Sequence, residues 1–261
     1  MPVVDICIPS YNRPDLLQQC IEKIESTTSI DYKLTVIDDC SPDKGVQQYI
    51  STLNSKVNKL RNHQNQGFPK TVNKAVRSTY NDYICILNSD TLPMPGWLEV
   101  LVDVLEQDKK VGIVGPLLLF HPNSPNGIGG AVQHAGIVFN VNKMPIHRFL
   151  NWPADHPKVQ KYNDELQAVT GACMLIRRKV WNEIGGFAEV YGAGTFEDCE
   201  FTIKSKWLAY KVAYTPDAML YHWVGASAIE HPSGGYPIQQ NYYKWLERCG
   251  GSVIMDDWKW W

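Results

Sequence analysis

The sequence lacks any long uninterrupted hydrophobic run. None of its apolar stretches approaches the ~18 consecutive residues that a membrane-spanning helix requires, so no transmembrane span is expected. The chain begins MPVVDICIPSYN, with neither a basic segment nor a long apolar core, and this predicts no signal peptide. Together these absences indicate a cytoplasmic protein.

Paired cysteines are also lacking. The chain has seven cysteines, an odd number, and none of them forms a Cys-x-x-Cys pair. Cys7, Cys85 and Cys173 fall inside apolar runs, as buried reduced thiols do. This pattern argues against a disulfide framework and a zinc site, and it is typical of a cytosolic protein.

The chain has little excess charge of either sign, with a formal net charge of −2. Nothing global therefore steers it toward nucleic acid, and no nucleic-acid partner is expected. One segment is locally basic, and either a solvated helix face or a phosphate-facing role explains it. Its members are Lys59, Arg61, His63, Lys70, Lys74 and Arg77.

What the sequence does have is an alternation of strand and helix patterns. Apolar strand patterns cover 3–9, 33–39, a run that ends at Asp90, and 111–120, and helical patterns lie between them at 14–25, 46–53, 70–78 and 97–107. Asn12 is predicted to cap the first of these helices. Such alternation indicates an α/β fold with a parallel, doubly wound sheet.

The pattern changes after about residue 120. Strands are predicted at 132–140 and 166–178, with an irregular segment at 142–158 between them and a helix at 179–184. No linker or internal repeat separates the two halves. The second half is therefore expected to complete one mixed sheet.

Polar residues stand at three strand ends: Pro9-Ser10-Tyr11, Asp38-Asp39 and Asn88-Ser89-Asp90. In doubly wound sheets ligands bind beyond the carboxyl ends of the strands, so these three segments are expected to share one crevice. Asp90 or Thr91 would otherwise serve as a cap for the next helix. If the aspartates of two such segments face one another, a hard divalent cation with oxygen ligands would relieve their repulsion.

Two further features carry chemistry. Glu197 and Asp198 open a helix after a glycine-rich turn, and the predicted apolar side of this helix carries Phe201, Trp207 and Leu208. The macrodipole favours carboxylates there, and a general base for an acceptor hydroxyl is the functional alternative. His222 ends the strand VAYTPDAMLYH, where a structural histidine and a ligand are both open interpretations.

The order of these segments resembles the family 2 glycosyltransferases, from Pro2 to about Ser227. The motifs that carry the resemblance are, in order, IPSYNR, VIDDCSPD, NQGFPKTVN, ILNSDTLPMPGWL, GACMLIRRKVWNEIGGF, FEDCEF and HWVGAS. The resemblance implies the GT-A fold, which is Rossmann-like, with a central mixed, mostly parallel sheet flanked by helices. VGPLLLF and VQHAGIVF are similar to the rhamnosyltransferase-like and polysaccharide subgroup.

The resemblance implies roles for residues in the nucleotide-binding half, 1–120. Pro9, Tyr11 and Asp39 would line the nucleobase pocket, with Tyr11 stacking on the base and Asp39 accepting from a ring nitrogen. The nucleotide loop would be shaped by Asn65, Gly67 and Asn73. The donor's remaining contacts would come from Asn12, Asp38, Lys70, Asn88 and Ser89.

The resemblance also implies the catalytic residues. Asp90 would be the direct metal ligand, His222 a further contact to the metal or the diphosphate, and Asp198, beside Glu197, the base of an inverting displacement. Asn88 stands where the family's metal motif has its first acidic residue, which leaves strict metal dependence open. Val72 stands where some relatives carry an arginine for the diphosphate, so Lys70 substitutes or no cation is used.

The activity implied is transfer of a sugar from a UDP- or dTDP-sugar to a hydroxyl of a glycan or lipid-linked acceptor, with Mn²⁺ or Mg²⁺ assisting departure of the diphosphate. A catalytically silent sugar-nucleotide-binding or glycan-binding module is one alternative. A nucleotidyltransferase is another, although IPSYNRPDL lacks the glycine-rich basic phosphate loop of that class.

The predicted organisation is one domain, 1–228, whose half 121–228 binds the acceptor and carries the catalytic base, followed by an aromatic-rich extension, 229–261. An acceptor wall and a surface loop are both open for the region that holds His147, Arg148, Trp152 and Tyr162. In the extension, Trp258, Trp260 and Trp261 flank Lys259. They suit peripheral membrane contact, a partner's groove such as a homodimer contact, or packing back on the domain.

Overall fold

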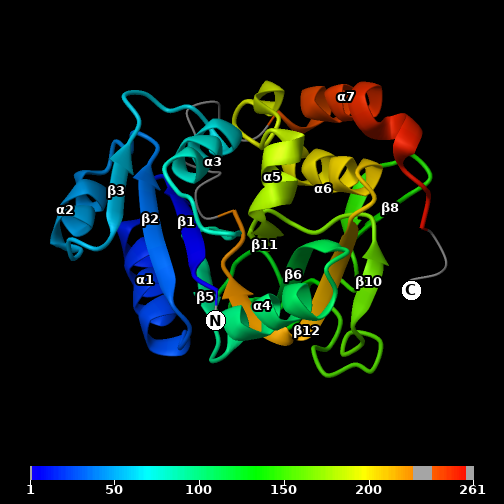
Figure 1. Cartoon of the computed structure of the whole chain (residues 1–261), viewed down its shortest axis with the longest axis horizontal. Coiled ribbons are helices and arrows are strands. Elements are labelled where there is room, and N and C mark those ends of the chain that lie inside the picture. Colours follow the sequence, from blue (N-terminus) through cyan, green and yellow to red (C-terminus); the bar gives the residue numbers. More distant parts are fainter. Residues whose placement is uncertain (1, 226–236, 257–261) are drawn as a thin grey trace.

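The computed structural model describes residues 2–225 and 237–256, and one large mixed sheet organises them (Figure 1). Along its main path the strand order is β10-β12-β6-β11-β4-β1-β2-β3; β5 pairs with β12, β7 pairs with β6, and β8 and β9 form a separate ribbon. The strands are β1 Val4–Ser10, β2 Tyr32–Asp38, β3 Asn58–Arg61, β4 Tyr83–Leu87, β5 Thr91–Pro93, β6 Val111–Phe120, β7 Val132–His134, β8 Ile137–Phe139, β9 Pro145–His147, β10 Asn163–Leu166, β11 Cys173–Arg177 and β12 Lys211–His222.

Most strands of the main path run in one direction. β1 is parallel to β2 and β4, β2 is parallel to β3, and β6 is parallel to β12. β11 is antiparallel to both β4 and β6, so it leaves those two aligned with each other, and β10 is antiparallel to β12. The prediction of a central mixed, mostly parallel sheet is confirmed.

Helices cover both faces of this sheet, because alternate residues of each strand point to opposite sides. Ile6 and Ile8 of β1 pack with α1, α2 and α4, whereas Cys7 packs with α3, α5 and α6. The helices are α1 Pro14–Thr27, α2 Lys44–Thr52, α3 Phe68–Arg77, α4 Trp97–Gln107, α5 Arg178–Ile184, α6 Glu197–Trp207 and α7 Ile238–Cys249, with 3₁₀ turns η1 at Glu189–Tyr191 and η2 at Gly250–Ser252. No helix within the described ranges combines the length and the apolar character that crossing a bilayer requires.

Two local predictions about helices are wrong. Arg13, in the left-handed region with φ 51°, precedes α1 in place of Asn12, whose Oδ1 accepts a hydrogen bond of 3.3 Å from the backbone of Asp43. Asn12 thus ties the start of α1 to the loop before α2. On α6, Phe201 is buried as expected, but Trp207 and Leu208 are exposed, because the helix ends there and turns away from the core.

Two predicted strands are each divided. The segment 132–140 becomes β7 and β8, because Gly136 between them adopts φ +100°, which breaks the extended backbone. The segment 166–178 becomes the end of β10 and β11, and residues 167–172 between them form a loop. This loop contains Gly171, whose backbone N–H donates a hydrogen bond to the side chain of Asp198.

The helix α7 packs on α6 through a buried carboxylate. Glu200 accepts from Arg248 of α7 at 2.6 and 2.7 Å, from Lys204 at 2.7 Å, and from the Tyr191 hydroxyl at 2.7 Å. Trp245 of α7 is fully buried in a hydrophobic cluster with Tyr191 and with Cys199 and Ile203 of α6. Residues 237–256 of the predicted C-terminal extension therefore pack on the sheet-and-helix body, and the tryptophans at 258, 260 and 261 lie outside the described residues.

Replacement of Glu200 by Gln is expected to remove part of the protein's acid sensitivity. Burial alone would raise the pKa of Glu200, but hydrogen bonds from Arg248, Lys204 and Tyr191 lower it to about 2. A carboxylate with a depressed pKa stabilises the fold above its unfolded pKa, near 4.5, and loses that contribution as the pH falls toward 2. Melting temperatures measured between pH 6 and pH 3 should fall less in Glu200→Gln than in the parent; an equal fall, as expected for the exposed control Glu165→Gln, would contradict this.

Candidate functional site

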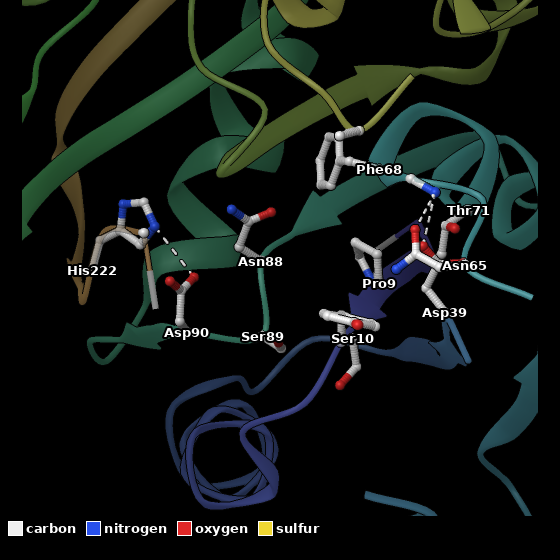
Figure 2. Close-up of a pocket in the computed structure, with 14 residues that line it drawn as sticks. Pro9, Ser10, Asp39, Asn65, Phe68, Thr71, Asn88, Ser89, Asp90 and His222 are labelled. Carbon is white, nitrogen blue, oxygen red and sulfur yellow. Dashed lines mark hydrogen bonds and ion pairs between the residues drawn. The ribbon is translucent and has the colours of Figure 1, made fainter. Parts of the chain in front are cut away.

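An open crevice, about 760 Å³ when the adjoining solvent space is included, lies at the carboxyl ends of β1, β2, β4 and β12 (Figure 2). It brings together the three predicted strand ends, although only one residue of the Asp38-Asp39 pair reaches it. The lining residues are Pro9, Ser10, Tyr11, Asp39, Asn65, Gly67, Phe68, Thr71, Asn88, Ser89, Asp90, Ala193, His222 and Gly225.

Asp39 stands at one end of the crevice (Figure 2). Its Oδ1 accepts from the side chain of Asn62 at 2.7 Å and from the backbone of Gln66 at 2.8 Å, and its Oδ2 accepts from Gly67 N at 2.9 Å. Burial raises the pKa of Asp39 above its usual range, although these hydrogen bonds oppose the rise. Asp39 therefore anchors the loop 62–67 and still faces the crevice.

The loop before α3 depends on a glycine at 67. Gly67 has φ +78°, and a Cβ there would collide with the carbonyl oxygen of Gly192. Phe68 N donates to Ala193 O at 3.2 Å, so the two chain segments are joined at this point. This close approach places Phe68 and Ala193 in the crevice wall.

Gly67→Ala is expected to destabilise the fold by about 3 kcal/mol, from left-handed strain and overpacking combined, and to weaken binding of any ligand in the crevice. Gly96→Ala is the matched control, because Gly96 has φ +80° but no atom within 4 Å of the added Cβ. Its expected cost is only about 1 kcal/mol of backbone strain. If the two variants had equal urea-unfolding midpoints, the close contact between Gly67 and the Gly192 carbonyl would not be the reason that residue 67 must be glycine.

Asp90 and His222 meet at the other end of the crevice (Figure 2). The short antiparallel pairing of β5 with β12 sets Thr91 opposite His222, and Trp223 N donates to Asp90 O at 3.1 Å. His222 Nε2 lies 3.2 Å from Asp90 Oδ1, and both side chains are largely buried. Asp90 does not cap a helix, because α4 begins only after Gly96.

Only one residue of the predicted Asp38-Asp39 cluster shares the crevice with Asp90. Asp38 is fully buried on the far side of the β2 terminus, where it pairs with Arg61 at 3.2 Å and accepts from Ser41 and Gln47. Asp39 is stabilised by hydrogen bonds from the N–H donors described above. Asp38 therefore holds the β2–α2 loop and is not among the residues that line the crevice.

Lys70 and Asn73 also lie away from the crevice. Lys70 is exposed in a surface groove with Lys74 and Arg77 and does not line the crevice. Asn73 is buried and exchanges hydrogen bonds of 2.9 Å with the backbone of Phe187. Its side chain joins α3 to the loop after α5, which is a structural role.

Asp198 lies beside the crevice, although it is not one of the lining residues. Its Oδ2 accepts from Gly171 N at 2.9 Å and its Oδ1 from Cys199 N at 2.7 Å. A Cβ built on Gly171 would lie 3.4 Å from both Asp198 Cβ and the Phe68 ring, so Gly171 is in contact range of both Asp198 and this wall residue. The neighbouring Ala172 O accepts from Asn88 N at 2.9 Å, which links Asp198 to the Asp90 turn.

The two acidic residues at the start of α6 differ in exposure. Asp198 is half-buried and Glu197 is buried, with its Oε2 unpartnered. Burial raises the pKa of Asp198, against the lowering effect of the Gly171 and Cys199 N–H groups. Burial and then the charge of Asp198 raise the pKa of Glu197 well above its usual range. The two N–H donors favour the charged form of Asp198, whereas the Oε2 atom of Glu197 has no such donor.

Some residues that line the crevice were not predicted as site residues from the sequence. Ser10 is the last residue of β1, and Phe68 and Thr71 lie within NQGFPKTVN, three residues apart on one face of α3. Ala193 and Gly225 reach the wall only through the folded chain. Of the predicted acceptor wall, Arg148 is buried with its guanidinium 4.4 Å from the Phe149 ring centroid, and Tyr162 faces a separate groove with Asp103 and Asp217.

Metal-ligating side chains are sparse. Among residues 2–225 and 237–256 no cluster of three or more histidine, cysteine, aspartate or glutamate side chains is arranged to hold a metal ion. The Asp90–His222 pair remains as a two-residue candidate.

The model of the family described as Glycosyl transferase family 2 matches residues 5–185. Uncharacterized protein y4gI of Sinorhizobium fredii is 28% identical over 234 residues, which cover 87% of this chain and 25% of that protein. O-antigen biosynthesis protein RfbC of Myxococcus xanthus is 26% identical over 258 residues, covering 94% of this chain and 19% of that protein. The chain therefore spans a quarter or less of the length of these relatives.

Among solved structures, GalNAc-T7 with UDP, GalNAc and Mn²⁺ superposes with a TM-score of 0.73 at 16% sequence identity. The match covers 95% of this chain and 48% of that one. At this identity the likeness concerns the fold alone, and it confirms the predicted GT-A architecture.

Proposed function

This chain belongs to glycosyl transferase family 2, and from that premise we propose that it transfers a sugar from a nucleoside-diphosphate donor to an acceptor hydroxyl. The observation that supports this most directly is the crevice itself. It has Asp39 at one end and Asp90 with His222 at the other, and Asp198 is bound to Gly171, which is near the wall residue Phe68. One elongated donor would meet all three carboxylates.

The donor's base belongs at the Asp39 end. Pro9 and Tyr11 line the crevice there together with Asn65 and Gly67. An aromatic ring offers a stacking face for the base, and the carboxylate of Asp39 can accept from a ring N–H. A pyrimidine, from a UDP- or dTDP-sugar, is the proposed base, and the UDP bound in the GalNAc-T7 structure is consistent with it.

The donor's diphosphate belongs at the Asp90 end, where a divalent cation fits the available groups. Asp90 offers carboxylate oxygens and Ser89 lines the wall beside it. Mg²⁺ is commonly held by one or two carboxylates together with substrate phosphates and water, so one protein carboxylate suffices. Asp90 is proposed as the direct ligand of Mn²⁺ or Mg²⁺, and His222 as a contact to the metal or the diphosphate. When bound, the cation would offset the charge that develops on the leaving diphosphate.

The proposed base is Asp198. A raised pKa makes a carboxylate a stronger proton acceptor, and the two backbone N–H groups fix its direction. In the proposed displacement the acceptor oxygen forms a bond to the anomeric carbon as the bond from that carbon to the diphosphate oxygen breaks, and the hydroxyl proton passes to Asp198. One displacement inverts the anomeric configuration. Glu197 would support the site by remaining protonated.

The acceptor is proposed to be a glycan or a lipid-linked sugar. The similarity to an O-antigen biosynthesis protein supports a polysaccharide pathway. The rhamnosyltransferase-like subgroup, a membrane or dimer contact through the C-terminal tryptophans, and the division of the chain at residue 228 stay predictions.

A silent binding module is the second candidate, because Asn88 replaces a carboxylate and metal ligands are few. Slow hydrolysis of the donor in the presence of Mn²⁺ separates the two candidates, since a module that only binds leaves the donor intact. Family membership favours transfer of the sugar over transfer of a nucleotidyl group.

A thermal-shift panel of nucleotide sugars with Mn²⁺ is expected to select UDP- or dTDP-sugars. A ligand at 100 times its Kd stabilises the folded state by about 2.7 kcal/mol, which raises Tm by roughly 5–10 °C in a protein of this size. GDP- and ADP-sugars at equal concentration serve as controls. Stabilisation by those purine donors alone would contradict the proposed base.

A further inference from the structure

A polar side chain of α7 enters the turn that leads into α6, which lies alongside α7 (Figure 1). This side chain is Asn241, and it is fully buried. Its Nδ2 group donates to the carbonyl oxygens of Tyr191 and Gly194, both at 2.8 Å, and to Thr195 Oγ1 at 3.2 Å. The family match ends at residue 185, so Asn241 lies outside it and has no role in the transfer described above.

The neighbours of Asn241 decide the orientation of its amide. The oxygen and nitrogen of an amide have almost the same shape, and their hydrogen-bond partners distinguish them. On one side Lys244 Nζ, which can only donate, lies 3.1 Å from Asn241 Oδ1. On the other side lie two carbonyl oxygens, which can only accept. The NH₂ group therefore faces the turn, and each of its two hydrogens has a carbonyl acceptor.

The turn that Asn241 holds has an unusual backbone. Its φ angles are 62° at Gly192, 136° at Gly194, 80° at Thr195 and 71° at Phe196. Side chains other than glycine adopt the left-handed region at a cost, and such a conformation persists only where its surroundings hold it. α7 supplies that hold twice, because the Trp245 ring also stacks on the Phe196 ring, with centroids 6.2 Å apart.

The turn leads directly into the helix that carries the proposed base. Phe196 O accepts from Glu200 N at 2.8 Å, which is the first backbone hydrogen bond of α6. Asp198 is the second residue of that helix, and its Oδ2 accepts from Gly171 N at 2.9 Å. A rotation of the turn would therefore turn the start of α6 and move the Asp198 carboxylate away from Gly171.

The two ends of the turn are held by different helices. At the crevice end, Ala193 O accepts from Phe68 N of α3 at 3.2 Å, and both residues line the crevice. At the α6 end, Gly194 and Thr195 are held by Asn241 of α7. Loss of the Asn241 amide should therefore disturb the proposed base more than the crevice wall.

We propose that Asn241 is a positioning residue for Asp198. Its amide holds the turn 191–196, and thereby the start of α6, in the arrangement that directs the Asp198 carboxylate toward Gly171 N. This inference deepens the proposed function and rests on it for its catalytic consequence. It gives the segment 237–256 a part in sugar transfer in addition to its packing on the body of the protein.

The test is a ¹H–¹⁵N spectrum of the full chain labelled with ¹⁵N-glycine, recorded without nucleotide. The Gly171 signal is assigned by its loss in Gly171→Ala, and its position without the carboxylate is taken from Asp198→Ala. In Asn241→Ala the Gly171 signal is expected to move toward that second position. A Gly171 signal at the parent position in folded Asn241→Ala would overturn the proposal.

Two further variants sharpen this measurement. Tyr242→Phe removes a neighbouring hydrogen bond of α7, from the Tyr242 hydroxyl to Asn142 O, and keeps the Asn241 amide. It should leave the Gly171 signal in place, and a displacement as large as in Asn241→Ala would show that any loosening of α7 moves this signal, against the proposal. Asn241→Ser keeps one donor and is expected to give a smaller displacement. It replaces Asn241→Ala if that variant does not fold, and an unmoved signal there would equally overturn the proposal.

The catalytic consequence is measured separately. Turnover of the UDP- or dTDP-sugar selected by thermal shift is expected to fall about 10–10²-fold in Asn241→Ala, as misplacement of a reacting group causes. The affinity for UDP with Mn²⁺ should change less than threefold. An equal loss of affinity and turnover would assign Asn241 to the donor site and contradict the positioning role. If the parent turned over no nucleotide sugar, the proposed function would fail, while the Gly171 signal would still decide whether Asn241 positions Asp198.

Discussion

Asp198→Asn is expected to lower the rate of sugar transfer by about 10²–10⁴-fold, the range that general base catalysis supplies, while the affinity for the donor stays within about twofold. The amide keeps the size of the side chain, and its oxygen can still accept from Gly171 N. It cannot take a proton from the acceptor hydroxyl. Product formation and donor titration, measured on the same preparation, separate the two effects.

The matched control for Asp198→Asn is Asp103→Asn, an exposed change on α4. It should leave both rate and affinity unchanged. Transfer at the parent rate by Asp198→Asn would remove this residue from the mechanism. Loss of donor affinity together with the rate would instead assign Asp198 to binding.

Asp90→Ala is expected to weaken donor binding and to slow transfer by 10²-fold or more, because stabilisation of a leaving group by a metal supplies several kcal/mol. Treatment of the parent protein with EDTA should give a loss of similar size, and added Mn²⁺ should restore the parent but not the variant. Donor titrations with and without Mn²⁺ provide the measurement.

His222 helps to separate a metal effect from a fold effect in this experiment. Removal of Asp90 leaves His222 with its contact to Gln133, so the melting temperature should change by only a few degrees. If donor affinity were unchanged both in Asp90→Ala and after EDTA treatment, the proposed metal role of Asp90 would be untenable.

Much of the fold could be predicted, because apolar periodicity reports which faces are buried. The helix 97–107 and the strand 111–120 were predicted to the residue; the helix has apolar residues at helical spacing, and the strand is buried along its whole length. Predictions failed where a single backbone angle decides the outcome, as at Gly136, whose φ of +100° divides β7 from β8. An apolar sequence pattern does not show which glycine adopts such a backbone angle.

The site could be predicted in part, since the carboxyl ends of parallel strands meet at one edge. This rule correctly brought the β1, β2 and β4 ends together at one crevice. It could not decide which of Asp38 and Asp39 faces the crevice, because adjacent residues of a strand point to opposite sides of the sheet. It also gave no signal for Gln133, whose side chain contacts His222 from a distant segment of the chain.

The most direct test of a single crevice acting on one donor is a crystal structure of the chain with a nucleoside diphosphate and Mn²⁺. The base should lie against Asp39, the diphosphate and cation beside Asp90, and the open end of the diphosphate should point to Asp198. A nucleotide bound elsewhere, or one whose diphosphate points away from Asp198, would contradict the account.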